Sequence, residues 1–128
     1  MTIQDQFLLA LTCWRENRHG GRVGMQSVAN VILNRAAQRK TSPYAECVRP
    51  WQFSSITAKG DHQLALWPLA DDPQFAIAMD LVSEASDGTL ADITGGATSY
   101  YALSMTTSPA WALQMTRTVE IEGQVFFK

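Results

Sequence analysis

Cysteine and histidine, the residues that most often build metal and redox sites, are scarce in this chain of 128 residues. It has two cysteines, Cys13 and Cys47, and two histidines, His19 and His62. The cysteine spacing fits neither a zinc motif nor a redox motif, so we expect buried free thiols. Neither histidine has a carboxylate at ligand spacing. The sequence therefore predicts no metal ion and no cofactor.

Runs of one charge sign and long apolar runs are also missing. The net charge is −2, which provides no electrostatic argument for nucleic acid or a stable membrane association. Residues 1–6 carry no basic side chain, and the apolar run 7–11 is too short for a secretion signal or a membrane span. We therefore expect the protein to stay in the cytoplasm until another component releases it.

Several catalytic motifs are absent as well. The chain has no Gly-x-Ser-x-Gly turn, no phosphate-binding glycine loop and no His-Glu-x-x-His pair. A Cys–His nucleophile pair is formally open for Cys47 and His62, although a buried cysteine and a surface histidine are much the stronger explanation of both residues. The chemistry that remains is that of the 12 acidic residues.

The N-terminal part has the apolar period of two helices, 3–18 and 22–39, separated by Gly20 and Gly21. Counting about 100° per residue, Glu16 lies at the margin of the first apolar stripe, beside the glycine break. The expected inner faces consist of Ile3, Phe7, Leu8, Leu11 and Trp14 in the first helix and Val23, Val28, Val31, Ile32 and Ala36 in the second.

Shorter elements follow. Ser42-Pro43 and Asp72-Pro73 are helix-start signals, each an N-cap residue followed by proline, and Gly88 ends the second of these helices. The expected strands are 51–56, 98–102 and a C-terminal hairpin over 118–127, with a loop and one helical turn over 57–71. The sequence predicts one α+β domain over 1–128, with a helical N-terminal lobe and a small antiparallel sheet.

Glu16 is the acidic residue with the strongest case for chemistry. A carboxyl among apolar neighbours tends to stay protonated, and such a group can act as general acid on a glycosidic oxygen. A solvated helix-end glutamate in a patch with Arg15 and Arg18 is the structural alternative, which composition and spacing alone favour. Capping or exposure explains Asp5, Asp71, Asp72, Asp87, Glu120 and Glu122.

Four short blocks, in order, resemble a known family over nearly the whole chain. Glu16–Gly20 followed by Gly24–Arg35 resembles the opening motif of the SleB-type cell-wall hydrolases, which include spore-cortex-lytic enzymes and bacterial and phage relatives. The other blocks are Cys47-Val48 with Gln52-Phe53-Ser54, then Gly96–Tyr101, then Trp111 with the strands of 119–127.

The resemblance implies a lysozyme-like or lytic-transglycosylase-like domain that cleaves the glycan of peptidoglycan, with Glu16 as catalytic acid. Gly20 stands where the family has a second acidic residue, and 57–72 is not a close match. Asp61 is the one other candidate for a partner carboxylate, and it also fits a turn residue. We therefore predict a lytic transglycosylase with Glu16 as single acid and base, and a hydrolytic muramidase as the alternative.

The expected substrate-binding residues are polar or aromatic. Gln52 and Ser54 share one face of the strand predicted over 51–56, where they can bond sugar hydroxyl or acetamido groups. Tyr100 and Tyr101 point to opposite faces of their strand, so at most one of them lines the groove. Trp111 can stack on a sugar ring or pack in the core.

Two other classes of function remain open at this stage. One is a non-catalytic glycan-binding module, and the other is a peptidoglycan peptidase or amidase that uses Cys47 and His62. The short cytoplasmic chain and the phage relatives predict a monomeric phage or prophage endolysin, released to the cell wall by a separate pore-forming (holin-type) protein.

Overall fold

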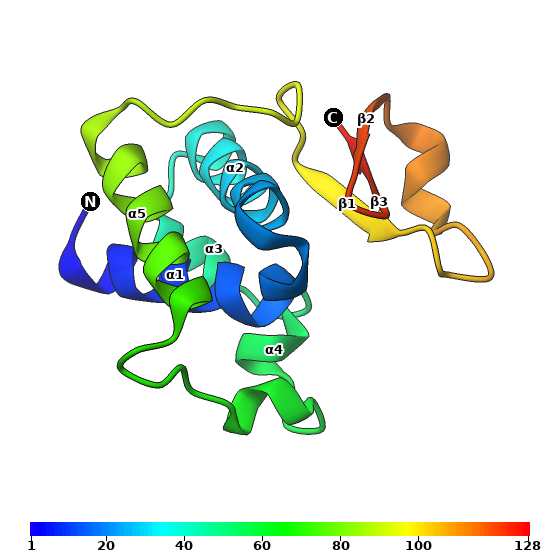
Figure 1. Ribbon diagram of the computed structural model, residues 1–128. Coiled ribbons are helices and arrows are strands. Elements are labelled where there is room, and N and C mark those ends of the chain that lie inside the picture. The colour runs from blue at the N-terminus through cyan, green and yellow to red at the C-terminus, as the bar shows by residue number, and fades with distance from the viewer.

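The computed structural model describes residues 1–128, with a helical lobe beside a small sheet (Figure 1). The α-helices are α1 (Ile3–Asn17), α2 (Gly21–Arg39), α3 (Pro43–Cys47), α4 (Ser54–Thr57) and α5 (Pro73–Asp87). The strands are β1 (Ser99–Ala102), β2 (Arg117–Ile121) and β3 (Gln124–Phe127). Single 3-10 turns occur at η1 (Arg18–Gly20), η2 (His62–Ala65) and η3 (Ala110–Gln114). The predicted α+β arrangement is confirmed.

Capping residues set the helix ends where the sequence predicts them. The Ser42 hydroxyl accepts a hydrogen bond from the backbone N–H of Ala45, and Asp72 caps α5 through the N–H groups of Gln74 and Phe75. Gly88 ends α5 with a positive φ of 76°, a conformation that glycine adopts without strain. Local hydrogen bonds thus account for these boundaries.

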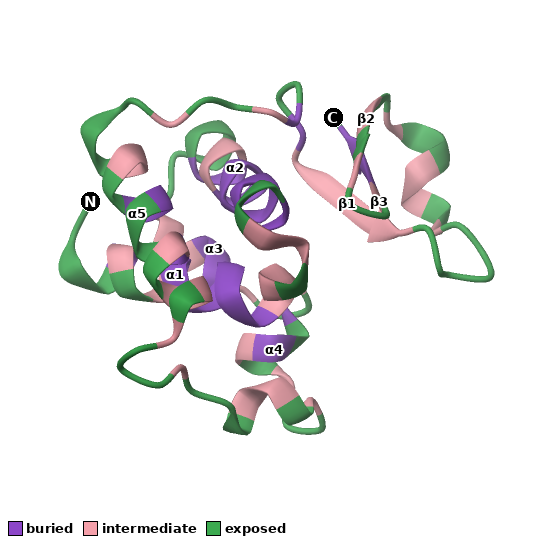
Figure 2. Ribbon diagram, in the orientation of Figure 1, coloured by how far each residue is buried: buried purple, intermediate pink, exposed green.

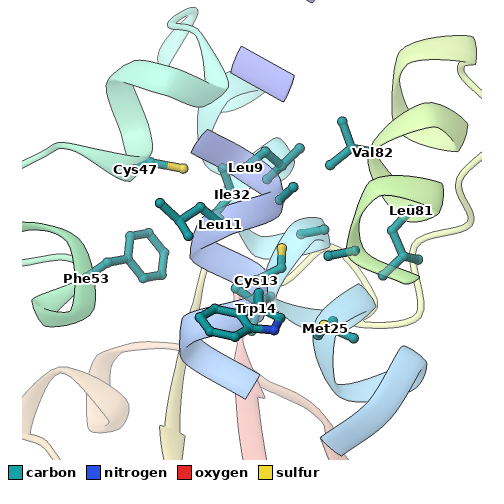
Figure 3. Close-up of a cluster of buried hydrophobic side chains, with 14 residues drawn as sticks. Leu9, Leu11, Cys13, Trp14, Met25, Ile32, Cys47, Phe53, Leu81 and Val82 are labelled. Atoms are coloured by element: carbon teal, nitrogen blue, oxygen red, sulfur yellow. The ribbon is translucent and has the colours of Figure 1, made fainter. Parts of the chain in front are cut away.

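The main core surrounds the C-terminal half of α1, which packs against α2, α3 and α5 (Figure 3). Leu9, Leu11 and Trp14 are among its buried residues. The predicted inner faces are wrong at Ile3 and Phe7, which are 81% and 45% exposed, and at Val23, which is 47% exposed. Figure 2 shows that most of the N-terminal half of α1 is exposed or intermediate, whereas burial is concentrated in the C-terminal half.

The sheet is antiparallel with strand order β1-β3-β2, and the predicted C-terminal hairpin of β2 and β3 is confirmed. Its inner face packs on α2 through a small cluster of Val31, Ala97 and Phe126. No helix is long and apolar enough to cross a membrane.

The strand predicted over 51–56 is wrong. Residues 50–52 form a turn in which Trp51 has a positive φ of 68°, and Ser54 begins α4. Trp51 is 96% exposed and Phe53 is 1% exposed, although a strand would place both on one face. A strand needs a neighbour to accept its hydrogen bonds, and the sheet lies elsewhere in the fold.

Candidate functional site

A groove runs over the C-terminal end of α1 in two neighbouring sections. The first, called here the acid section, has a volume of about 430 Å³ and is lined by Glu16 and residues of 48–58. The second, called the sheet section, has a volume of about 620 Å³ and is lined by residues of α2, β1 and η3. Trp51 and Gln52 line both sections, so the two adjoin, and together they are called the groove here.

Glu16 lies in the last turn of α1 and is partly buried. Burial raises the pKa of its carboxyl, because the charged form loses solvation, and the nearby charge of Asp61 raises it further. The hydroxyls of Ser55 and Tyr100 and the charge of Arg35 oppose this rise. The net direction is upward, which is the direction that a general acid needs near neutral pH.

Tyr100 on β1 is the direct partner of this carboxyl. Its hydroxyl donates a hydrogen bond of 3.0 Å to Oε1 of Glu16, and its ring packs 5.3 Å from that of Phe126. Burial and the adjacent Glu16 raise the pKa of Tyr100 well above its usual value, so the phenol stays a neutral donor. Strand β1 thus supplies a hydrogen-bond donor to the Glu16 carboxyl.

Asn17 occupies the space next to Gly20. A Cβ at Gly20 would lie 2.8 Å from Oδ1 of Asn17, and a Cβ at Gly24 would lie 2.7 Å from its Nδ2. That amide donates a hydrogen bond of 3.3 Å to Gln124 of β3. The Asn17 amide therefore takes the room that a side chain at Gly20 would need, and it links α1 to the sheet.

The Asp61 carboxylate accepts local hydrogen bonds and does not line the groove. It accepts a hydrogen bond of 2.6 Å from the Ser54 hydroxyl and one of 2.9 Å from the backbone N–H of Gln63, as the N-cap of η2. The bond from Ser54, followed by that from Gln63, lowers the pKa of Asp61. Glu16 is consequently the only acidic residue that lines either section.

The other predicted substrate-binding residues fall into two groups. Gln52 and Ser54 line the acid section and Trp111 lines the sheet section, although the first two lie on a turn and a helix instead of a strand. Tyr101 faces away and packs 5.6 Å from Phe127 and 6.0 Å from Trp111. Of the two tyrosines, Tyr100 is the one at the groove.

The cysteines are buried free thiols, as predicted. Burial raises the pKa of Cys47 to about 12 and that of Cys13 well above its usual value. A thiol that stays protonated is a poor nucleophile. The buried Cys47 therefore gives no support to the peptidase alternative.

Sequence reasoning missed most of the groove lining, including three of its large side chains. Arg35 and Arg39 line the sheet section, and Trp51 stands between the two sections. Basic residues near the C-terminal end of a helix are sufficiently explained by the helix dipole, so the sequence did not indicate a groove role for these arginines. The signal that was available for Trp51 is its place directly after Pro50 and before the Gln52–Ser54 block.

Comparisons with known proteins agree with this geometry. The family model described as Cell Wall Hydrolase matches residues 20–127. The catalytic domain of the germination-specific lytic transglycosylase SleB from Bacillus anthracis is 25% identical, with a TM-score of 0.76 over 100% of this chain and 97% of that chain. The catalytic domain of the Bacillus cereus SleB protein is 27% identical, with a TM-score of 0.74 over 100% and 92%. No curated protein sequence matches the chain.

The ranges of these matches differ at one important place. The family model begins four residues after Glu16, whereas both structural matches extend over the whole of this chain, α1 included. The fold expected from the resemblance is thus confirmed.

Proposed function

The chain belongs to the cell wall hydrolase family, and we propose that it cleaves the glycan strand of peptidoglycan as a lytic transglycosylase with Glu16 as acid and base. The observation that carries the proposal is a partly buried carboxyl with a raised pKa, held by Tyr100 at the floor of a groove. The SleB catalytic domain from Bacillus anthracis, which has a similar fold, is itself described as a lytic transglycosylase.

The proposed reaction needs one carboxyl and no water. Protonated Glu16 donates its proton to the glycosidic oxygen between N-acetylmuramic acid and N-acetylglucosamine, and the bond from that oxygen to C1 breaks. The 6-hydroxyl of the muramic residue then attacks C1, and the Glu16 carboxylate takes up the hydroxyl proton. The product is a 1,6-anhydro sugar, and Glu16 returns to its protonated form.

The absence of a second acid in the groove favours this route over hydrolysis. Inverting and retaining hydrolases use two carboxyls that flank the scissile bond. Here Asp61 accepts hydrogen bonds from Ser54 and Gln63 and does not line the groove. Intramolecular attack by the 6-hydroxyl removes the need for a second carboxylate to activate water.

The test is digestion of purified peptidoglycan by the wild type and Glu16→Gln, with products identified by mass spectrometry. We expect 1,6-anhydro-muropeptides from the wild type and a rate about 10²- to 10⁴-fold lower in the variant. Glu84→Gln is the control, since Glu84 is a partly exposed glutamate that pairs with Arg22 and does not line the groove. Reducing-end muramic acid would replace the proposal by a muramidase, and released peptides would replace it by a peptidase.

We further propose that the enzyme acts in lysis from inside the host cell, as a phage or prophage endolysin released by a holin-type protein. The sequence blocks resemble a family that includes phage relatives, which supports this role. Expression in a bacterial cytoplasm should lyse cells only when a pore-forming protein is co-expressed. Lysis or export without that partner would contradict it.

A further inference from the structure

The sheet section of the groove is cationic. Arg35 and Arg39 line it, and no acidic residue does. Apart from Met115, its remaining lining is polar or aromatic, with Tyr100 and Trp111 among the residues. Of the nearby carboxylates, Glu16 accepts a hydrogen bond from Tyr100, and Glu46 is shared between Arg39 and Arg49.

Arg35 is a buried cation without an ion-pair partner. It is 8% exposed, its Nε donates to the backbone carbonyl of Thr98, and its guanidinium lies 5.4 Å from the ring centre of Phe53. Its buried Nη1 has no hydrogen-bond partner, and none of the ion pairs of the chain includes it. A positive charge left uncompensated in a low-dielectric place favours the approach of an anion.

Arg39 adds a second charge at the rim. Its Nη1 lies 2.7 Å from Oε2 of Glu46, which also binds Arg49 at 3.0 Å. One carboxylate shared by two guanidinium groups leaves this cluster with a net charge of +1. The Arg39 side chain is 41% exposed and lines the section, whereas Arg49 does not line it. Arg39 is therefore positioned to share its remaining N–H donors with a ligand.

We propose that the sheet section binds a carboxylate carried by the muramic acid residue, and that Arg39 is the residue that recognises it. Muramic acid differs from N-acetylglucosamine by a lactyl ether, which ends in a free carboxylate or in a stem peptide with carboxylates of its own. The inference rests on the proposed function, because Tyr100 and Gln52 place this section directly beside Glu16. Recognition of the anion would select a muramic residue for the bond that is cut.

Three forms of the substrate separate the possible sources of the carboxylate. Intact peptidoglycan carries stem-peptide carboxylates, amidase-stripped strands carry only lactyl carboxylates, and peptidoglycan amidated with carbodiimide and methylamine carries neither. Initial rates at subsaturating substrate are measured for the wild type, Arg39→Gln and Arg49→Gln. Arg49→Gln is the matched control, since both variants remove one guanidinium from Glu46 and only Arg39 lines the groove.

We expect Arg39→Gln to cleave carboxylate-bearing substrate about tenfold more slowly than Arg49→Gln, as for the loss of one charge-assisted hydrogen bond. Amidation of the substrate should slow the wild type by a similar factor and leave Arg39→Gln unchanged. An effect that appears only on stripped strands identifies the lactyl carboxylate, one confined to intact peptidoglycan identifies the stem peptide, and one on both shows that the section accepts either carboxylate. Equal rates for Arg39→Gln and Arg49→Gln on carboxylate-bearing substrate would overturn the proposal. So would an amidation of the substrate that slows the wild type and Arg39→Gln by the same factor.

A binding measurement separates this proposal from the cleavage reaction. Soluble fragments of the three substrates are titrated by NMR into Glu16→Gln, alone and combined with Arg39→Gln. If the wild type makes no glycan product, the proposed function fails, while binding that depends on both the carboxylate and Arg39 still supports the anion site. Fragments that bind equally well after amidation would reject the site even if cleavage occurs.

Discussion

At the scale of single residues, burial and hydrogen bonding act in opposite directions on the Glu16 carboxyl. Burial raises its pKa, and the hydroxyls of Ser55 and Tyr100 lower it. Because the net pKa is raised, Glu16 contributes stability in its neutral form at low pH, and this stability is lost as pH rises through its folded-state pKa. In the proposed mechanism the same ionisation removes the proton that Glu16 donates, so activity should fall in the same pH window.

Tyr100→Phe tests this balance. Loss of the hydroxyl removes a donor that stabilises the Glu16 carboxylate, so the pKa of Glu16 should rise further. The alkaline limb of the rate profile should therefore move to higher pH, and the maximal rate should fall about tenfold as the carboxyl loses its orientation. The measurement is the rate of peptidoglycan cleavage against pH.

Tyr101→Phe is the control for that experiment, because its hydroxyl pairs with Ser108 away from the groove. Its pH profile should match that of the wild type. An alkaline limb that stays in place in Tyr100→Phe would show that the hydrogen bond to Glu16 does not set the titration of the acid.

The backbone conformation of Trp51 is the reason that the strand predicted over 51–56 does not form. The alternation of Trp51, Gln52, Phe53 and Ser54 predicts a strand, yet Trp51 takes a positive φ that bulky residues rarely adopt. That conformation turns the chain after Pro50 and leaves the indole 96% exposed at the junction of the two groove sections. A backbone conformation disfavoured at the residue level is kept because the buried Phe53 and α4 anchor the following residues.

At the scale of elements, a buried carboxylate joins the end of α2 to α3. Glu46 is fully buried and accepts hydrogen bonds from Thr41 and Arg39 at the end of α2 and from Arg49 after α3. Burial by itself raises the pKa of Glu46, but these hydrogen bonds outweigh it and lower the pKa from 4.5 to about 2. The lowered pKa makes this contact a source of stability at neutral pH.

Glu46→Gln should lower the free energy of unfolding at pH 7 by roughly 3 kcal/mol, the difference between the two protonation equilibria. For a lowered pKa the contribution is present above the unfolded value and is lost as pH falls from about 4.5 to about 2. Urea unfolding at several pH values measures both effects. A variant whose deficit is the same at pH 7 and at pH 2.5 would contradict the assignment, since the wild type should lose most of its advantage in that interval.

At the scale of the whole molecule, the groove lies between two separately packed parts. Glu16 comes from α1 in the main core, and Tyr100 comes from the sheet, which packs on α2 through the Val31–Ala97–Phe126 cluster. Phe126 holds the sheet cluster and also packs on the Tyr100 ring. The geometry of the acid therefore depends on how the sheet sits on α2.

Phe126→Ala should cost about 3–5 kcal/mol of stability. It should also lower the cleavage rate at temperatures well below its unfolding midpoint, where the variant is still folded, because Tyr100 loses its packing partner. Leu81→Ala on α5 is the control, since it removes a fully buried side chain of the main core at a cost of about 2–5 kcal/mol. Thermal unfolding gives the stability of each variant, and peptidoglycan digestion at 20 °C below its midpoint gives the rate. Equal rates in the two folded variants would contradict a coupling of the sheet to the acid.

The sequence by itself determined the elements whose stability is local. The caps at Ser42 and Asp72, the glycine at the end of α5 and the C-terminal hairpin all follow from residues within a few positions of one another. The candidate acid also came from the sequence, through the motif that begins at Glu16.

Tertiary structure alone decided which residues meet at that acid. Tyr100 lies 84 positions from Glu16, and the Arg35 contact to Thr98 spans 63 positions. It likewise decided that Tyr100 faces the groove, that Asp61 does not, and that Arg39 reaches the rim. The physical reason is that caps and turns are made by neighbours in the chain, whereas a groove is made by side chains that only packing brings together.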